Sequence, residues 1–254
     1  MLVFIIPLKS PQLSKSWDHV SKLFERCIRS VCNQTSANFR VIVVCHEKPQ
    51  IEFSHPHITY IEVDFPPPAP DKKSKGIDKL RKILLGLNYA QQLNPSHAMN
   101  VDADDCVSKH LAKLVEQNPQ SNGWFVDKGY VYEDGSKILY FKRKDFHQWC
   151  GTCNIVRYDL IDIPERIEDA WINFKKYYCS HRRLVKKLAQ QGTPLNRLPF
   201  SGAIYILGHG DNNSGNVNKF IPNKGIVTRL KTILFNFRPL TSLVRKEFGI
   251  YDLP

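Results

Sequence analysis

The chain has 254 residues, of which 42% are hydrophobic and 24% charged, and its formal net charge is +12. This composition fits one large α/β domain with a substantial core, and no run approaches the eighteen or so apolar residues of a membrane-spanning helix. The positive charge predicts an anionic partner, and nucleotide phosphates, nucleic acid and an anionic membrane face all satisfy it.

The N-terminal segment indicates a buried strand rather than a targeting signal. Residues 1–7 are apolar but lack a basic n-region, and the run is too short for a signal peptide. The seven cysteines are an odd number, scattered through segments with strand-like or helix-like patterns. We therefore expect a cytoplasmic protein with reduced thiols.

The first half of the chain alternates apolar runs with amphipathic segments. Apolar runs predict strands at 2–6, 39–45 and 58–63, and a short strand just before Asp102. Apolar residues at helical spacing predict helices over 20–31 and 77–92, the second preceded by a basic loop at 71–76. This rhythm predicts a doubly wound, mostly parallel sheet flanked by helices, in which ligands bind beyond the carboxyl ends of the strands.

The second half has a different pattern. A helix is expected over 107–117 and a charged helical region over 164–191. Short strands are expected at 123–127, 130–132, 137–141, 154–157 and 202–207, three of them around a hairpin turn at Asp134-Gly135. We therefore divide the chain into a first half at 1–105, which carries the predicted ligand-binding edge, and a second half at 106–218, which includes a small antiparallel region for a second substrate.

The remaining residues, 219–254, form a basic, amphipathic C-terminal extension. Lysines and arginines alternate there with leucine, isoleucine and phenylalanine, which predicts a helix. Such a helix either lies on an anionic membrane face, where lipid-linked acceptors would be, or packs back on the domain.

Three carboxylates, Asp102, Asp104 and Asp105, stand at the end of a short predicted strand, after the apolar residues 97–99. Like charges this close repel one another, and a hard cation such as Mg²⁺ or Mn²⁺ between them removes the repulsion. The alternative is that they cap the following helix and complement its dipole. A calcium loop is excluded because its sixth position, a glycine in such loops, is Val107 here. An aspartyl-phosphatase motif is disfavoured by Cys106 at its fifth position and by its place in mid-chain.

Two further features have simpler explanations. Cys150 and Cys153 form a C-x-x-C motif. A thioredoxin-type redox motif would open a helix after the first strand, and a zinc site would need a second pair of ligands, and neither condition is met. We therefore interpret Gly151-Thr152 as a tight turn beside the pocket. Three tryptophans either stack on sugar rings or belong to the core: Trp124, Trp149 and Trp171.

Taken in order, these residues resemble the nucleotide-sugar glycosyltransferases of the GT-A fold, near family 2. The resemblance rests on the first strand ending at Pro7, the second strand ending at His46-Glu47, the basic helix with Gly86-Leu87, and the strand that leads to Asp102-Ala103-Asp104. The late segment Gly208 to Ser214 is similar to the C-terminal histidine segment of many such enzymes, so the resemblance covers residues 1 to about 215.

This resemblance implies transfer of a sugar from a nucleotide-diphosphate sugar, UDP being the first choice of nucleotide, to a glycan, lipid-linked or other hydroxyl acceptor. It also implies Mn²⁺ or Mg²⁺ held by Asp102, Asp104 and His209. The residues implied in donor binding are Pro7, Leu8, Lys9, Glu47, Lys75, Lys79, Asp102, Ala103 and Asp104. Lys72 would add positive charge near the phosphates, together with Lys75 and Lys79. The alternative is that these lysines belong to a solvated basic loop.

An inverting enzyme of this kind also needs a base for the acceptor hydroxyl. Glu168-Asp169 matches the x-E-D motif of family 2 members but lacks the neighbouring glycine, and it equally suits the first turn of a helix. Asp145, His147 and His181 are rivals. A nucleotidyltransferase is the alternative enzyme, although such enzymes usually have a glycine-rich loop after the first strand and no glycine lies between Lys9 and Lys15. A noncatalytic nucleic-acid-binding protein is a third alternative. It explains the positive charge but not the cluster of carboxylates, so we expect no nucleic-acid partner.

Overall fold

The structure is a computed structural model that describes residues 1–164, 180–208 and 234–253. Its central sheet has the strand order β10-β6-β9-β4-β1-β2-β3. The strands are β1 (Leu2–Pro7), β2 (Phe39–Cys45), β3 (Ile58–Glu62), β4 (His97–Asn100), β6 (Gly123–Phe125), β9 (Asn154–Arg157) and β10 (Asn196–Arg197). Strand β9 runs antiparallel to both neighbours, whereas every other pairing in this sheet is parallel. The protein is therefore an α/β protein with a mostly parallel central sheet, as the sequence predicts.

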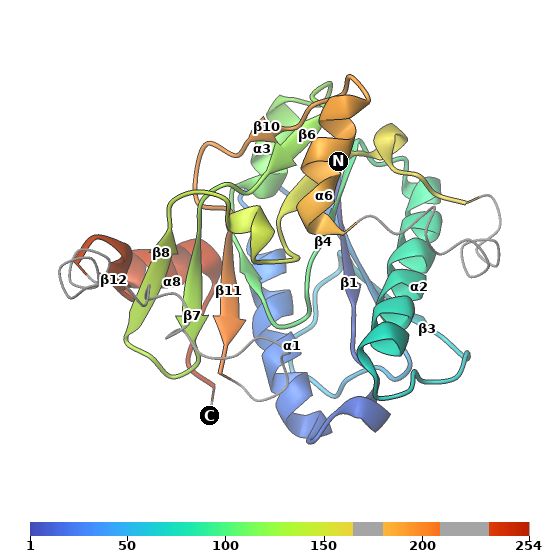
Figure 1. Cartoon of the computed structure of the whole chain (residues 1–254). Helices are drawn as coiled ribbons and strands as arrows, with labels where there is room; N and C mark the ends of the chain where they lie inside the picture. The colour runs from blue at the N-terminus through green and yellow to red at the C-terminus, as the bar shows by residue number, and fades with distance from the viewer. Residues whose placement is uncertain (165–179, 209–233, 254) are drawn as a thin grey trace.

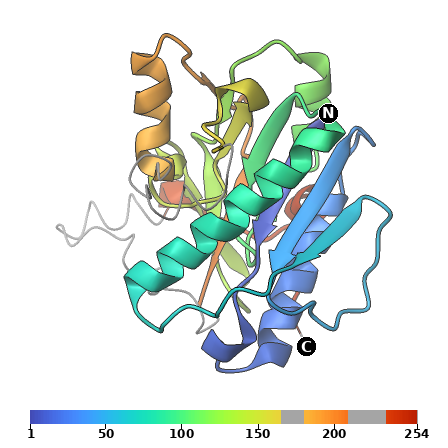
Figure 2. The ribbon, with the colours of Figure 1, turned by 90° about the vertical axis from the view of Figure 1, so that its right-hand side faces the viewer.

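Helices cover both faces of this sheet (Figures 1 and 2). Side chains of β1 alternate between the faces, because successive residues of a strand point in opposite directions. Leu2, Phe4 and Ile6 pack with α1 (Trp17–Cys32) and α3 (Leu111–Gln117). Val3 and Ile5 pack with α2 (Lys72–Ala90) on the opposite face. Helix α6 (His181–Gln190) packs beside α2 through Leu188, against β6 and β9.

Helix α2 begins five residues before the predicted start at Ile77, because Asp71 caps it by accepting hydrogen bonds from the backbone N–H groups of Lys73 and Ser74. The predicted basic loop is therefore the first turn of a helix, which lies along the sheet (Figure 2). Gly86 allows this close packing, since a Cβ there would lie 2.8 Å from Ile5 Cγ2.

A second sheet, with the order β12-β8-β7-β11-β5, lies beside the first (Figure 1). Its strands are β5 (Cys106–Val107), β7 (Gly129–Glu133), β8 (Ile138–Lys142), β11 (Ala203–Leu207) and β12 (Phe237–Pro239). Strands β7 and β8 form the predicted hairpin around Asp134-Gly135. The described part of the C-terminal extension supplies β12 and helix α8 (Ser242–Phe248), and the ring of Phe248 is buried against this sheet.

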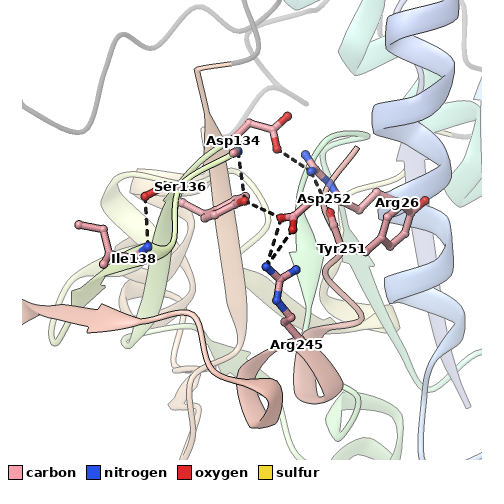
Figure 3. Close-up of polar contacts among 9 residues, drawn as sticks. Arg26, Asp134, Ser136, Ile138, Arg245, Tyr251 and Asp252 are labelled. Carbon is pink, nitrogen blue, oxygen red and sulfur yellow. Dashed lines mark hydrogen bonds and ion pairs between the residues drawn. The ribbon is translucent and has the colours of Figure 1, made fainter. Parts of the chain in front are cut away.

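A buried arginine connects α1 to the second sheet and the C-terminal segment (Figure 3). Arg26 Nη1 lies 2.7 Å from Asp134 Oδ1 in the hairpin turn and donates to the Tyr251 carbonyl at 3.3 Å. Arg245 pairs with Asp252, whose Oδ1 accepts a hydrogen bond from the Tyr132 hydroxyl. The described residues of the extension thus pack on the domain.

Two local predictions are wrong. Val107 does not start a helix but pairs with Ala203 in the second sheet, and α3 begins at Leu111. The segment at 123–127 does not join the antiparallel hairpin region, because β6 belongs to the central sheet. Among the described residues, no helix is both long and apolar enough to cross a membrane.

Candidate functional site

A cavity of about 310 Å³ opens where the loops after β1 and β4 separate. The strand order reverses between these two strands, since β2 and β3 follow on one side and β9 and β6 on the other. Doubly wound sheets bind ligands at such a switch point. The residues predicted to bind the donor that line this cavity are Pro7, Leu8, Lys9, Lys75, Lys79, Asp102, Ala103 and Asp104.

The three carboxylates after β4 have different surroundings. Asp102 and Asp104 are half-buried and line the cavity. Asp105 is fully buried and points away from it, because its Oδ1 accepts the Ile206 N–H and its Oδ2 accepts the Thr152 hydroxyl. Burial, with the nearby charges of Asp104 and Asp102, raises the pKa of Asp105 well above its ordinary value. Only Asp102 and Asp104, the first and third positions of the motif, therefore face the cavity.

The turn at Gly151-Thr152 holds this loop in place. The Thr152 side-chain oxygen accepts the Asp102 N–H at 2.9 Å, and Cys150 Sγ lies 3.2 Å from Asp105 Oδ2. A Cβ on Gly151 would lie 2.7 Å from Asp102 Oδ2, so the carboxylate needs a glycine beside it. Burial raises the pKa of Cys150 and of Cys153 well above the usual value. Their thiols are packing and hydrogen-bonding groups of the turn.

Positive charge reaches the cavity from α2. Lys79 Nζ lies 2.5 Å from Asp102 Oδ1, and Lys75 lines the cavity one turn earlier. Desolvation lowers the pKa of Lys79, but the charge of Asp102, its hydrogen bond and the charge of Asp104 outweigh this, so the pKa is raised. Lys79 therefore stays protonated, in a position to bind phosphate oxygens.

A second lysine on α2 fixes the loop after β1. Lys82 is fully buried and donates 2.8 Å hydrogen bonds to the Leu8 carbonyl and to Asp78 Oδ2. Burial lowers the pKa of Lys82, against the charge of Asp78. His46 lies 3.8 Å from the other oxygen of Asp78. The sequence did not single out Lys82 and Asp78, because an Asp–Lys pair four residues apart is typical of an exposed helix face.

Other predicted site residues lie elsewhere. Glu47 is exposed and is not among the residues that line the cavity, and its neighbour His46 is held by the Phe65 carbonyl at 3.0 Å. Lys72 is exposed at the start of α2 and does not line the cavity. Glu168, Asp169 and His209 fall outside the described residues, as does Trp171. Trp124 is a core residue, and Trp149 stacks on Tyr140.

A second cavity of about 240 Å³ lies on the other side of the Lys79–Asp102 pair, between α2 and α6. Leucine and isoleucine side chains line much of it, and His181 and Asn154 are among its polar groups. His181 Nε2 is buried and has no hydrogen-bond partner within the described chain. Burial lowers the pKa of His181 to about 4. The two cavities therefore share a charged wall, while the second has an apolar interior.

Asp145 and His147, two predicted candidates for the base, meet a residue that the sequence did not single out. Asp127 follows β6, and its Oδ1 accepts the Asp145 N–H at 2.8 Å. One potential ligand atom from each of these three residues lies within 4.8 Å of the others. Asp127 and His147 are buried, whereas Asp145 is exposed. Burial lowers the pKa of His147, against the nearby charges of Asp145 and Asp127.

The donor set of Asp102 and Asp104 fits a hard divalent cation. Both carboxylates are half-buried on one short loop at the edge of a cavity, and oxygen ligands suit Mg²⁺ or Mn²⁺. Asp102 already pairs with Lys79, so an ion bound there would share this carboxylate with the ammonium group. Asp105 is unsuitable as a ligand because its oxygens accept hydrogen bonds from Ile206, Thr152 and Cys150.

Comparison with known proteins gives similarities at the level of fold only. No protein-family model matches the sequence, and neither does any curated protein. Residues 1–349 of S. aureus TarS align with 81% of this chain at 11% identity and a TM-score of 0.42, and this chain spans only 60% of that structure. The 2-C-methyl-D-erythritol 4-phosphate cytidylyltransferase of Francisella tularensis aligns over 86% of this chain and 95% of its own length, at 10% identity and a TM-score of 0.43. Since these values are low, the fold assignment rests on the strand order and pairing of this chain.

Proposed function

We propose that this protein is a metal-dependent glycosyltransferase that uses a nucleotide-diphosphate sugar. The observation that carries the proposal is the cavity at the strand-order reversal, where Asp102 and Asp104 face lysines of α2. A nucleoside diphosphate needs a cation and several positive donors around its phosphates, and a cavity of about 310 Å³ at the carboxyl ends of parallel strands matches that need. UDP is the nucleotide we propose first.

In this proposal the loop after β1 binds the nucleoside, and the D-x-D loop and α2 bind the diphosphate. The residues for the nucleoside are Pro7, Leu8 and Lys9, whose backbone is fixed by the bond from Lys82 to the Leu8 carbonyl. Asp104 and Asp102 would hold Mn²⁺ or Mg²⁺, which when bound supplies Lewis-acid neutralisation of the charge on the departing diphosphate. Lys79 and Lys75 add fixed positive charge at the same place, and Lys79 orients Asp102.

We place the acceptor on the far side of the Lys79–Asp102 pair, in the second cavity. Its apolar lining suits a glycan or lipid-linked hydroxyl acceptor that carries a nonpolar surface. The acceptor needs a base within hydrogen-bond reach, and Asp169 and Glu168 remain our candidates, whereas Asp145 lines neither cavity. The basic extension from residue 219 would bring the enzyme to an anionic membrane face if the acceptor is lipid-linked.

Calorimetric titration with UDP, with and without Mn²⁺, tests the proposal on wild type and Asp104→Asn. We expect binding that requires Mn²⁺ in the wild type and weakens at least about tenfold in Asp104→Asn, since loss of one carboxylate ligand removes both charge and a bond to the ion. Asp159→Asn is the matched control, because Asp159 is an exposed carboxylate that pairs with Arg157 and lines neither cavity. GDP and the other nucleotides follow if UDP does not bind.

The products separate the two enzyme classes. A glycosyltransferase releases a nucleoside diphosphate from the donor sugar, whereas a nucleotidyltransferase releases pyrophosphate from a nucleoside triphosphate, and ³¹P NMR distinguishes the two. Pyrophosphate release would replace our proposal with nucleotidyl transfer at the same cavity. Absence of metal-dependent binding by every nucleotide would overturn both, and salt-sensitive binding of nucleic acid in its place would support the noncatalytic alternative.

A further inference from the structure

A cluster of three potential metal ligands lies at the carboxyl end of β6, apart from the D-x-D loop. Asp127 follows β6, and Asp145 and His147 come from the segment that enters the short 3₁₀ turn Phe146–Gln148. The backbone brings these segments together, because the Phe146 N–H donates to the Asp127 carbonyl at 3.1 Å and the Asp145 N–H donates to Asp127 Oδ1. One ligand atom from each side chain lies within 4.8 Å of the others.

The surroundings of the His147 side chain distinguish this cluster from a chance grouping of acidic residues. His147 is only 7% exposed, and its buried Nδ1 has no hydrogen-bond partner among the described residues. A buried imidazole normally satisfies its nitrogens with protein groups or water. The ring is fixed edge-to-face on Phe125, with centroids 4.8 Å apart, and it presents a nitrogen to the two carboxylates.

Among the described residues, few groups balance the charge of Asp127. This carboxylate is 4% exposed, but its compensation consists of the Asp145 N–H and of Arg197 Nη1 at 3.7 Å. The Arg197 side chain is 73% exposed, so it can withdraw into solvent. Lys142, which interacts electrostatically with Asp145 and Asp127, lies over the Trp149 ring at 4.0 Å. A buried carboxylate with so few partners gains more from a bound cation than an exposed one does.

We propose that Asp127, Asp145 and His147 form a second divalent-cation site, selective for a borderline transition ion such as Zn²⁺. One imidazole and two carboxylates are typical ligands of such ions, whereas Mg²⁺ and Ca²⁺ prefer oxygen alone. Donors bound at ~2.1 Å in a tetrahedron lie about 3.4 Å apart, so ion binding requires the ligand atoms to approach one another by up to about 1.4 Å. Asp145 is exposed, which leaves a route for the ion and for a water or substrate oxygen in the fourth position.

This site is separate from the one that holds the donor in our proposed function. Asp127 lies at the end of β6 and Asp102 follows β4, and β9 runs between these strands. None of the three ligands lines either cavity described above. The site therefore stands or fails independently of nucleotide binding.

Titration with Co²⁺ and Zn²⁺ alone, on the whole chain without nucleotide, tests the proposal. We expect one equivalent of Co²⁺ to give weak visible d–d absorption and no intense near-ultraviolet band. Such a band arises from a cobalt–thiolate bond and would show that cysteines bind the ion instead. Zn²⁺ should displace it. His147→Ala and Asp145→Asn should each weaken binding at least about tenfold, since each removes one ligand of three. Asp145→Asn is informative even if His147→Ala folds poorly, because Asp145 is exposed.

Asp104→Asn is the matched control, and we expect it to keep Co²⁺ binding while it loses Mn²⁺-dependent UDP binding. The second site would be overturned if the Co²⁺ absorption persisted in Asp145→Asn and His147→Ala, or if the wild-type protein bound neither ion at micromolar concentration. Either result would leave the proposed function untouched. Conversely, a metal-binding cluster in a protein that binds no nucleotide would support the second site alone.

Discussion

Thr152 donates its hydroxyl hydrogen to Asp105 Oδ2 across 2.6 Å in the fully buried interior of the protein. The same oxygen of Thr152 accepts the N–H of Asp102, the first residue of the D-x-D motif. The position of the half-buried Asp102 and Asp104 carboxylates therefore depends on the Thr152 side chain, which lies in the turn before β9. This contact makes the Gly151-Thr152 turn a structural support of the candidate site.

Thr152→Val should destabilise the protein and loosen the D-x-D loop. The variant keeps the shape but removes the hydroxyl, which leaves the Asp102 N–H and one oxygen of Asp105 without this partner, at a cost of about 2–3 kcal/mol. Thr152→Ser keeps the hydroxyl and should cost only about 1 kcal/mol, for one buried methyl group. Urea unfolding measures both, and equal losses in the two variants would show that the hydroxyl has no special role.

Gly151→Ala should impair ligand binding more than stability. Its Cβ would lie 2.7 Å from Asp102 Oδ2, so the carboxylate must move away from its present position. We expect Mn²⁺-dependent UDP affinity to fall at least about tenfold, as for other changes around metal ligands. Gly76→Ala is the control, because nothing lies within 4 Å of a Cβ there and alanine should stabilise α2 by about 0.5–1 kcal/mol. Unchanged affinity in Gly151→Ala would mean that Asp102 has room to adjust.

Lys82→Met should be strongly destabilising. The substitution leaves the buried Asp78 carboxylate without its 2.8 Å partner and frees the Leu8 carbonyl, and loss of one member of a buried pair costs about 3–5 kcal/mol. Lys187→Met removes an ammonium from the more exposed Asp162 pair and should cost less than about 1 kcal/mol. Chemical denaturation compares them. Similar small losses would show that the buried Lys82–Asp78 pair contributes little to stability.

His181 should make the protein less stable in mild acid. Burial lowers its folded-state pKa from 6.5 to about 4, with Lys79 acting in the same direction and Asp102 opposing. Between pH 4 and 6.5 the unfolded chain therefore binds more protons at this residue than the folded protein, so the free energy of unfolding rises with pH across that window and falls on acidification. His181→Gln should flatten this part of the pH–stability curve. Parallel curves for the variant and the wild type would contradict the lowered pKa.

The central sheet was predictable because its strands are continuous apolar runs. β1 and β2 are buried on both faces, so residues 2–6 and 39–45 stand out from the sequence. Strand β5 has only two residues, too few to show the alternating pattern of a strand, so the sequence predicts a helix at Val107 instead. The place of β6 in the central sheet depends on its pairing with β9, a contact between segments far apart in the chain.

Within the candidate site, the sequence identified the motif but not the direction of each side chain. Asp102, Asp104 and Asp105 follow a strand in an irregular loop, where no periodicity separates the inward carboxylate from the two at the cavity. Lys82 has the spacing of a surface pair with Asp78, and burial alone distinguishes it. Asp127 directly follows the apolar run Trp124–Val126, and this polar residue at a strand end was the one local signal for the second cluster.

The D-x-D loop is also one of the covalent links between the two sheets. Strand β4 of the central sheet ends at Asn100 and β5 of the second sheet begins at Cys106, so the residues between them belong to neither sheet. Asp105 holds both ends of this link, since Thr152 precedes β9 in one sheet and Ile206 lies in β11 of the other. A rotation of one sheet against the other would therefore strain the loop that carries Asp102 and Asp104. A ligand that fixes Asp102 and Asp104 would, by thermodynamic linkage, stiffen the joint between the sheets, and slower amide hydrogen exchange in β5 and β11 would report it.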